Sequence, residues 1–171
     1  MKVMVYLADM KKCAKYARLN REIISEIIIN AMKWNDFLSV SQGFHTVHNY
    51  VSDDNMIRKG AISAKKGEKV LIPLNMRDGS LLCIGKGNLE WNYSAPHGAG
   101  RVLSRKKAKE MLSLDDFKES MKDVYTTSVC KETIDEAPDA YKKDVETLIG
   151  DTVEIFDKLK TVYNFKAKNN R

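Results

Sequence analysis

The sequence predicts an α+β fold in which a short-stranded mixed sheet is flanked by helices. Three observations lead to this prediction. Apolar residues recur at helical spacing over residues 7–32, short apolar runs separated by glycine and proline fill the centre, and helical patterns return after residue 105. We therefore expect a long N-terminal helix, a central sheet and a helical C-terminal layer. No repeat or linker interrupts the chain, so residues 1–171 are expected to form a single unit.

The composition fits one domain that binds polyanions. The chain has 171 residues, of which 43% are hydrophobic, enough for one core. Lysine and arginine number 29 against 23 acidic residues, a formal net charge of +6. Residues 101–109 and 165–171 are basic, whereas more than half of the acidic residues lie between 113 and 157. This pattern predicts a basic surface beside an acidic helical layer, which favours polyanionic partners without requiring them.

The cysteines and the N-terminus bear on the cellular compartment. Cys13, Cys83 and Cys130 are odd in number, far apart and without CxxC pairing, so neither a disulfide framework nor a zinc site is predicted. The N-terminus lacks the apolar run and cleavage site of a signal peptide, and no run is long enough to span a membrane. A cytoplasmic protein without a membrane partner is expected.

The first half is expected to hold one long amphipathic helix over residues 7–32 and several short elements. The apolar residues that define the helix are spaced by three and four: Met10, Cys13, Ala14, Ala17, Ile23, Ile24, Ile27, Ile28 and Ala31. Residues 34–43 are expected to form a turn and a short strand, and residues 44–51 a strand or an approach to one. Residues 58–68 are predicted to be a glycine-punctuated loop, followed by a buried strand over 70–72 that Pro73 ends.

The second half becomes helical after a last short strand over residues 80–84, which a turn at Asp78-Gly79 is expected to precede. Residues 105–111 are predicted to be a helix. Ser113 is a plausible N-cap for another helix to about residue 122, and the segment 133–136 repeats this signal. A final long helix is expected over 145–159, followed by a strand or extended tail over 161–167.

The segment WNYSAPHGAGRVLSR over residues 91–105 carries the clearest chemical pattern. Its two glycines allow the backbone to approach a ligand and to expose N–H groups to an anion. Arg101 and Arg105 are four apart, so on a helix they would share a face and could both bind phosphate oxygens. His97 is then a candidate acid-base or attacking group. A glycine-rich loop with a surface histidine is the alternative interpretation.

Two histidines, His45 and His48, lie three apart in HTVHNY. On a helix this spacing could bring both imidazoles near one metal, whereas on a strand they point to opposite faces. Because a strand is expected, only one can be a ligand. His48 is the candidate, and the Asn49 amide could orient a ligand or a phosphate; a core or surface histidine is the alternative. Further ligands would be needed, and no cluster with obvious metal spacing supplies them.

Other loops carry weaker patterns. Lys59 and Gly60 place a cation beside a glycine, which suits a phosphate. The polar residues of PLNMRDGS, among them Asn75 and Ser80, could hydrogen-bond a sugar or a base edge, although a hairpin turn satisfied within the chain is at least as good an interpretation. Residues 85–88 (GKGN) lack the spacing of a Walker A motif.

Taken in order, these motifs resemble one family, the RtcB-type RNA-splicing ligases. The matching pieces extend over nearly the whole chain: HNYV (48–51), RKGAISA (58–64), IPLNMRDGS (72–80), GKGN (85–88), SAPHGAGRVLSR (94–105), DEAPDAYK (135–142) and a lysine in YNFKA. The resemblance implies an enzyme that uses GTP and Mn²⁺ to join an RNA 3′-phosphate or 2′,3′-cyclic phosphate to a 5′-hydroxyl. Its RNA partners would be tRNA or broken RNA ends, in splicing or repair.

The resemblance also implies roles for individual residues. His97 matches the histidine that attacks GTP and holds GMP through a P–N bond, and Arg101 matches an arginine beside the reacting phosphate. His48 matches a manganese ligand. The residues expected to contact the nucleotide are Asn75, Ser80, Gly98, Ala99, Tyr141 and Lys166, and those expected to contact phosphate or RNA are Asn49, Lys59 and Arg105. Asn75 stands where other members often carry serine.

The chain resembles only the C-terminal portion of the family. The upstream half of the family, with its further metal ligands and nucleotide contacts, has no counterpart here, so the fold is expected to be incomplete relative to the family. An upstream polypeptide is an expected partner. Two functions stay open: an RNA ligase, or its nucleotidyl-accepting half, and a non-catalytic remnant that binds a guanosine nucleotide or RNA without a complete metal site.

Overall fold

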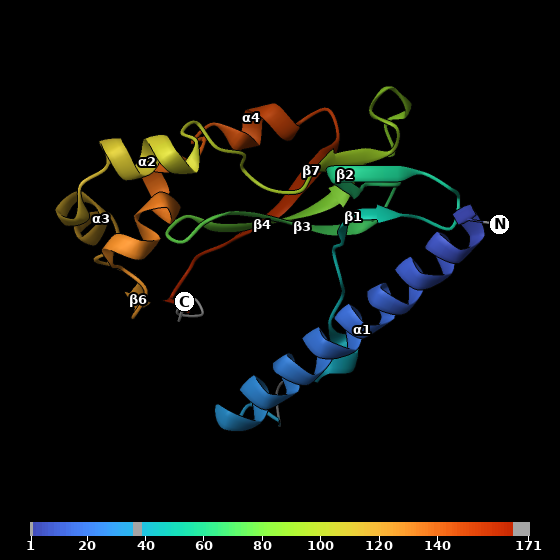
Figure 1. The fold of residues 1–171 in the computed structure, drawn as a ribbon, viewed down its shortest axis with the longest axis horizontal. Helices are drawn as coiled ribbons and strands as arrows, with labels where there is room; N and C mark the ends of the chain where they lie inside the picture. The colour runs from blue at the N-terminus through green and yellow to red at the C-terminus, as the bar shows by residue number, and fades with distance from the viewer. Residues whose placement is uncertain (1, 36–38, 166–171) are drawn as a thin grey trace. The chain divides into compact units, whose positions relative to one another are not determined.

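The computed structural model describes residues 2–35 and 39–165, which form helices and short strands as expected for an α+β chain (Figure 1). The chain divides into two compact units, Met1–Lys59 and Gly60–Arg171. Each unit is described by itself. The single unit over residues 1–171 stays a prediction.

The first unit is built on one long helix, α1 (Lys2–Ala31). The helix predicted over residues 7–32 is confirmed and begins earlier. Its apolar side chains remain largely exposed, with exposed fractions of 54% at Ile23, 60% at Ile27 and 51% at Ile28. Helical spacing therefore identified the helix, whereas the burial that this spacing normally signals is not found within the unit.

Short elements complete the first unit. They are the 3₁₀ helix η1 (Val40–Gln42), the strand β1 (His48–Val51) and the start of β2 (Ile57–Ser63). The strand predicted over residues 44–51 is confirmed in its second half. Residues 36–38 of the turn and strand predicted before it lie outside the described residues, and residues 40–42 form η1. The loop predicted over 58–68 is wrong in its first half, because β2 occupies residues 57–63.

The second unit contains two antiparallel strand systems. β2 pairs antiparallel with β5 (Ser94–Pro96). The larger sheet has the order β3-β4-β7, with bounds Lys69–Asn75, Gly79–Gly85 and Val153–Leu159. A short parallel pair joins β6 (Tyr125–Thr126) to β8 (Tyr163–Asn164). The single mixed sheet of the prediction is thus replaced by small separate sheets, because tight turns favour antiparallel neighbours.

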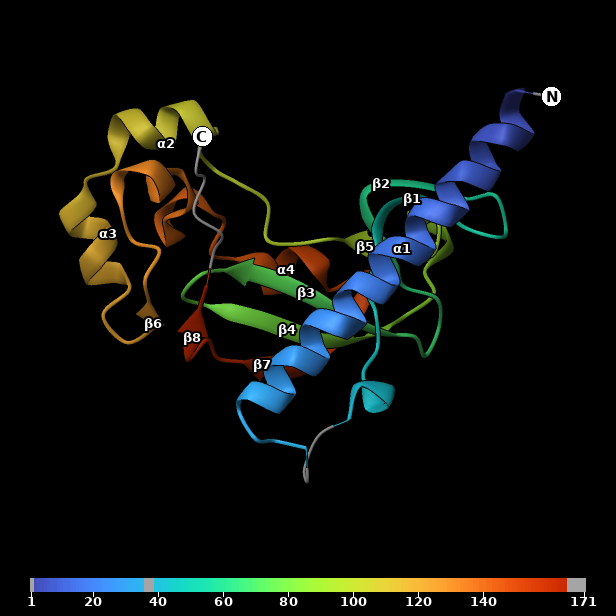
Figure 2. The ribbon, with the colours of Figure 1, turned by 60° about the horizontal axis from the view of Figure 1, so that its bottom comes forward.

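The main core lies on the β3-β4-β7 sheet. Helix α4 (Val145–Ile149) lies along this sheet in Figures 1 and 2, and its two terminal residues are buried in the core. Fully buried members of the cluster include Ile62, Ile72, Leu81 and Cys83. The cluster also contains Ala95 and Ala99, which flank His97. The apolar sheet therefore anchors the loop that carries the candidate nucleophile.

A helical layer beyond one end of the β3–β4 hairpin forms a second core (Figure 2). Its elements are α2 (Arg105–Met111), α3 (Leu114–Ser120), η3 (Lys131–Glu136) and η4 (Pro138–Ala140). Met76, from the turn after β3, joins Phe117 and other apolar side chains in this cluster. The predicted helix over 105–111 is confirmed. Ser113 caps α3 by accepting the Asp116 N–H at 3.0 Å, as predicted.

Two predicted boundaries in this unit are wrong. Pro73 does not end its strand: β3 continues to Asn75, because β3 is an edge strand and an edge residue can lack its N–H. The long helix predicted over residues 145–159 is wrong, because α4 ends at Ile149 and residues 153–159 form β7. The alternating, β-branched sequence of β7 suits a strand, and β4 supplies its partner. The capping signal at 133–136 begins no α-helix, since these residues belong to η3.

The predicted C-terminal strand is confirmed over the two residues of β8, and residues 166–171 lie outside the described residues. Over the described part of the chain, no helix is both long and apolar enough to cross a bilayer.

Candidate functional site

His97 lies directly after β5 and is exposed. Its Nδ1 is 2.6 Å from the backbone oxygen of Gly60, which belongs to the neighbouring strand β2. Gly60 has φ +67°, a left-handed conformation that favours glycine. A carbonyl oxygen can only accept, so Nδ1 carries the proton and donates it. In the neutral ring, Nε2 is therefore the nitrogen with the lone pair.

The HGAG loop is tied to the edge of the main sheet. The Ala99 N–H donates to the Pro73 oxygen at 3.1 Å, and a side chain at Gly98 would approach that same oxygen to 3.1 Å. Gly100 has φ +72°. The loop is therefore compact against β3, and the Ala99 N–H is used within the chain rather than by a nest for an anion.

Arg101 is held by several groups and lies before α2 rather than on it. Its backbone forms an isolated antiparallel bridge with Tyr141. Its guanidinium donates to the Leu103 oxygen at 3.0 Å, to the Tyr141 hydroxyl at 3.1 Å and to the Asp135 backbone oxygen, and it lies 4.8 Å from the centre of the Tyr141 ring. The predicted shared helix face with Arg105 is wrong, because the helix starts only at Arg105.

Arg105 nevertheless meets the same group of residues. It donates to the Asp135 carboxylate at 2.6 Å and to the Glu136 carboxylate. These two hydrogen bonds raise the pKa of Arg105 above its ordinary value. Asp135 is nearly buried while two-thirds of the Arg105 side chain is exposed, with exposed fractions of 8% and 67%. The pair therefore presents a cation at the surface and keeps the carboxylate beneath it.

Tyr141 joins Arg101 to Glu136, the carboxylate that also binds Arg105. Its hydroxyl donates to Glu136 and accepts from Arg101. Burial, reinforced by the Glu136 carboxylate, raises the pKa of Tyr141 to about 12. The phenol therefore stays protonated at neutral pH and acts as a fixed hydrogen-bond bridge. Its ring packs against the main core.

Asn75 and Ser80 lie at the two ends of the turn between β3 and β4. The Asn75 side chain accepts the N–H groups of Arg77 and Asp78, at 3.0 and 2.9 Å, and donates to the Asp78 carboxylate at 2.7 Å. The alternative of a turn satisfied within the chain is thus found for Asn75. Ser80 is opposite Pro73 in the β3–β4 pairing, and the backbone oxygen of Pro73 accepts the Ala99 N–H.

The remaining predicted residues lie outside this group. His48, Asn49 and Lys59 belong to the first unit and are exposed, and Asn49 has φ +59°. Lys166 lies outside the described residues. Among the residues that the structure describes, no group of three or more His, Cys, Asp or Glu side chains is placed to hold a metal ion.

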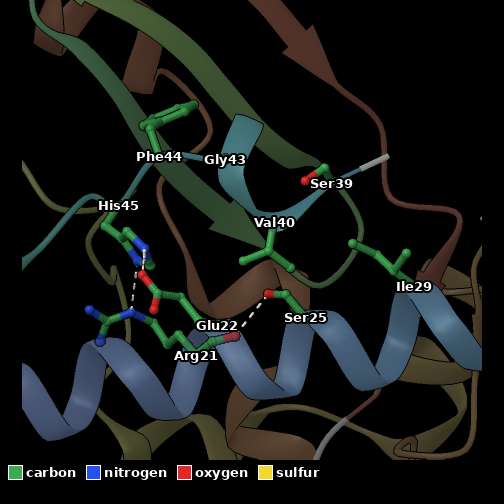
Figure 3. A pocket seen from close by; sticks show the side chains of 9 residues that line it. All are labelled: Arg21, Glu22, Ser25, Ile29, Ser39, Val40, Gly43, Phe44 and His45. Atoms are coloured by element: carbon green, nitrogen blue, oxygen red, sulfur yellow. Dashed lines mark hydrogen bonds and ion pairs between the residues drawn. The ribbon is translucent and has the colours of Figure 1, made fainter. Parts of the chain in front are cut away.

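A pocket of about 380 Å³ lies within the first unit, between α1 and residues 39–45 (Figure 3). The His45 ring stands between two charged residues of α1: Arg21 donates to its Nδ1 at 3.3 Å, and its Nε2 is 3.3 Å from Glu22. The hydrogen bond from Arg18 is the main cause that lowers the pKa of Glu22. None of the predicted site residues is among the nine described residues that line this pocket.

Comparison with known proteins identifies the family. A family model described as "RtcB: tRNA-splicing ligase RtcB" matches residues 2–167. The chain belongs to the RtcB family. This confirms the resemblance that the ordered motifs indicated.

Individual members of the RtcB family match over different lengths. The chain is similar to the RNA-splicing ligase RtcB of Escherichia coli K12, with 33% identity over 179 residues that cover 95% of this chain and 43% of that protein. It is 40% identical over 81 residues to the tRNA-splicing ligase RtcB of Aeropyrum pernix, covering 44% of this chain and 17% of that protein. The chain thus spans less than half the length of the RtcB proteins that it matches.

Sequence reasoning missed three groups at the site of this RtcB-family chain. The Gly60 carbonyl was overlooked because a backbone oxygen carries no sequence signal. Asp135 and Glu136 begin the DEAPDAYK motif, which by itself assigns them no role. The opposite charges of RVLSRKK and TIDEAP could have indicated their pairing with Arg105.

Proposed function

We propose that this chain is an RNA ligase, or the nucleotidyl-accepting part of one, that joins RNA 3′-phosphate or 2′,3′-cyclic phosphate ends to 5′-hydroxyl ends in RNA splicing or repair. GTP is the nucleotide donor, and a histidine-GMP species is the intermediate. Membership of the RtcB family supports the reaction class. The reduced cysteines expected from the sequence support a cytoplasmic setting.

The hydrogen bond between His97 and the Gly60 carbonyl is the observation that carries the proposal. It fixes the tautomer in which Nε2 has the lone pair, and it orients an exposed ring. A nucleophile held in this way needs no prior loss of a proton. Attack on phosphorus therefore begins from the Nε2 lone pair of the neutral ring.

The proposed chemistry proceeds in three transfers. The Nε2 lone pair attacks the α-phosphorus of GTP, a P–N bond forms, and pyrophosphate leaves with the electrons of the broken P–O bond. An oxygen of the RNA 3′-phosphate then attacks the same phosphorus, and the electrons of the P–N bond return to Nε2. Finally the 5′-hydroxyl of the second RNA attacks the RNA phosphorus and gives its proton to water, and GMP leaves.

Arg101 is proposed to stabilise the charge that develops on the phosphate oxygens. Its hydrogen bonds to Leu103, Tyr141 and Asp135 fix the guanidinium plane before any ligand arrives, so little reorganisation is needed in the transition state. Arg105, which is exposed, is proposed to contact phosphate or RNA. Lys59 and Asn49 of the first unit are each proposed to contact phosphate or RNA as well.

The guanosine is proposed to contact Asn75, Ser80, Gly98, Ala99, Tyr141 and Lys166. The Asn75 side chain is engaged in its own turn and the Ala99 N–H in its bond to Pro73. Their contacts would therefore use the Asn75 amide edge and the Ala99 carbonyl. Tyr141 would offer its ring edge, since its hydroxyl bridges Glu136 and Arg101.

Manganese does not fit the described residues by themselves. His48 would supply one ligand, and no group of three potential ligands is found among residues 2–35 and 39–165. A divalent ion needs further ligands. The missing ligands are expected from an upstream polypeptide.

The test is covalent labelling with GTP that carries ³²P at the α-phosphate, in the presence of Mn²⁺. We expect wild-type protein to acquire an acid-labile, alkali-stable label, which is typical of a P–N bond. His97→Ala should lose it completely. His45→Ala is the matched control, because His45 lies in the separate pocket of the first unit, and its label should equal that of the wild type.

Two outcomes would contradict the proposal. One is a label that persists in His97→Ala. The other is a wild-type chain that stays unlabelled even when it is mixed with a polypeptide equivalent to the remainder of the E. coli relative.

A second candidate function is favoured by the lack of a group of three potential metal ligands among residues 2–35 and 39–165. The chain would then bind a guanosine nucleotide or RNA without catalysis. Manganese-dependent ligation by the isolated 171 residues would exclude this alternative.

A further inference from the structure

Three aromatic side chains of the second unit pack together on its surface. They are Tyr125 on β6, Tyr163 on β8 and Phe165 just after β8. The ring centres of Tyr125 and Tyr163 are 5.5 Å apart, and those of Tyr163 and Phe165 are 6.2 Å apart with planes only 5° from parallel. We call these three residues the aromatic platform.

The aromatic platform is exposed. Its side chains have exposed fractions of 60% at Tyr125, 57% at Tyr163 and 68% at Phe165, and Val162 beside them is 63% exposed. Aromatic residues usually contribute much of their surface to a core, and a contiguous apolar patch on a protein surface commonly marks a binding site. None of the three rings is a member of either apolar core of the unit.

Strand pairing explains how the platform is held. Tyr125 and Tyr163 are direct partners in the parallel β6–β8 pair, and the Tyr125 N–H donates to the Val162 oxygen at 3.0 Å. Figure 2 shows the two short strands beside each other near the helical layer. Phe165 is two residues beyond Tyr163, a spacing that directs both rings to the same side of an extended chain. The rings of Tyr163 and Phe165 therefore follow each other along one extended segment, and the Tyr125 ring lies beside Tyr163 on the neighbouring strand.

We propose that the aromatic platform stacks the unpaired bases of a single-stranded RNA end. This inference rests on the proposed RNA ligase function and adds a docking surface for the substrate. Exposed aromatic rings on adjacent strands are a recurring way of stacking bases, because every base has a π-face whatever its sequence. The near-parallel rings of Tyr163 and Phe165 offer two such faces along one strand.

Charge favours RNA over a polypeptide as the occupant. The chain carries a net charge of +6, and the exposed Lys160 precedes the platform by three residues. Two of the three rings are tyrosines, whose hydroxyls can hydrogen-bond a phosphate or a 2′-hydroxyl. The relatives are named as ligases of RNA and tRNA, so single-stranded RNA ends are the polyanion that the charge and the rings would meet together.

The experiment measures binding of a single-stranded RNA of about eight nucleotides with 2-aminopurine at one position. Stacking quenches this base analogue, and fluorescence anisotropy gives the dissociation constant. We expect Tyr125→Leu and Tyr163→Leu each to weaken binding by about fivefold to about 100-fold and to remove the quenching, because leucine keeps apolar bulk but has no π-face. Tyr163→Trp should bind at least as well as the wild type.

Phe156→Leu is the matched control, since Phe156 is 73% exposed on β7 and belongs to no ring contact of the platform. It should bind like the wild type. An RNA backbone with abasic positions should bind all variants equally. Circular dichroism confirms that each variant is folded.

Unchanged RNA affinity in the leucine variants would overturn the proposal, as would an equal loss with the abasic RNA. If the leucine variants keep their RNA affinity but lose self-association, the platform binds another polypeptide chain and not RNA. His97→Ala should keep the quenching while it loses the GMP label, so failure of the ligase proposal and failure of the platform are separate results.

Discussion

The carboxylate of Asp78 accepts hydrogen bonds from Arg77 at 2.7 Å and from Asn75 at 2.7 Å. The bond from Arg77 is the main cause that lowers the pKa of Asp78, and the bond from Asn75 adds to it. Asn75, predicted as a nucleotide contact, therefore has a role in the turn that leads from β3 to β4. This turn also places Met76 in the second core.

The lowered pKa of Asp78 predicts a pH-dependent stability. Because its pKa is lower in the folded chain than in the unfolded chain, the ionised form stabilises the fold. That contribution is complete above the unfolded pKa, and it is lost as the pH falls through the lower folded pKa. Urea denaturation between about pH 6 and about pH 3 should show a shallower loss of unfolding free energy in Asp78→Asn than in the wild type.

Asp115→Asn is the control for this measurement, because the Asp115 side chain is 92% exposed. Its pH profile should match the wild type. A profile of Asp78→Asn that also coincides with the wild type would show that the turn does not hold this carboxylate in solution.

The pairing of strand β7 with β4 depends on a glycine, Gly79. Gly79, the first residue of β4, has φ +81°, and an added Cβ would lie 1.8 Å from the Leu159 oxygen at the end of β7. This oxygen is backbone and cannot move aside alone. The β4–β7 pairing therefore requires glycine at this position.

Gly79→Ala is expected to lower the unfolding free energy by more than about 2 kcal/mol, because the clash adds to the cost of a left-handed conformation. Gly67→Ala is the matched control: Gly67 has a similar φ of +79°, and no atom lies within 4 Å of its added Cβ. It should cost only about 1 kcal/mol. Thermal and urea denaturation of the two variants measure the difference, and equal losses would contradict the steric explanation.

The second unit as a whole has two apolar cores, one on the β3-β4-β7 sheet and one in the helical layer. Ile72 is fully buried in the first and Phe117 is 1% exposed in the second. Met76 connects the hairpin to the helical layer, and Tyr141 connects Arg101 and Glu136 to the main core. We therefore expect the unit to unfold cooperatively.

Ile72→Ala and Phe117→Ala should each destabilise this unit by about 3–5 kcal/mol, since each leaves a cavity. Both should shift the same denaturation transition, followed by circular dichroism. A separate early transition in Phe117→Ala, with the sheet signal retained, would show that the helical layer unfolds alone.

Local sequence signals predicted a good part of the fold. The helical spacing of α1, the Ser113 cap and the helix at 105–111 depend on neighbours within a few residues, so the sequence by itself determined them. The HGAGR segment likewise contained the candidate nucleophile, and the order of the motifs indicated the RtcB family.

Tertiary structure decided what depends on distant residues. Residues 153–159 became a strand because β4 offers them a partner, and Pro73 is tolerated because β3 lies at a sheet edge. The Gly60 oxygen that orients His97 is distant in sequence, as are the carboxylates that bind Arg105. Hydrogen bonds and burial between such residues exist only after the chain has folded, so no local pattern in the sequence could specify them.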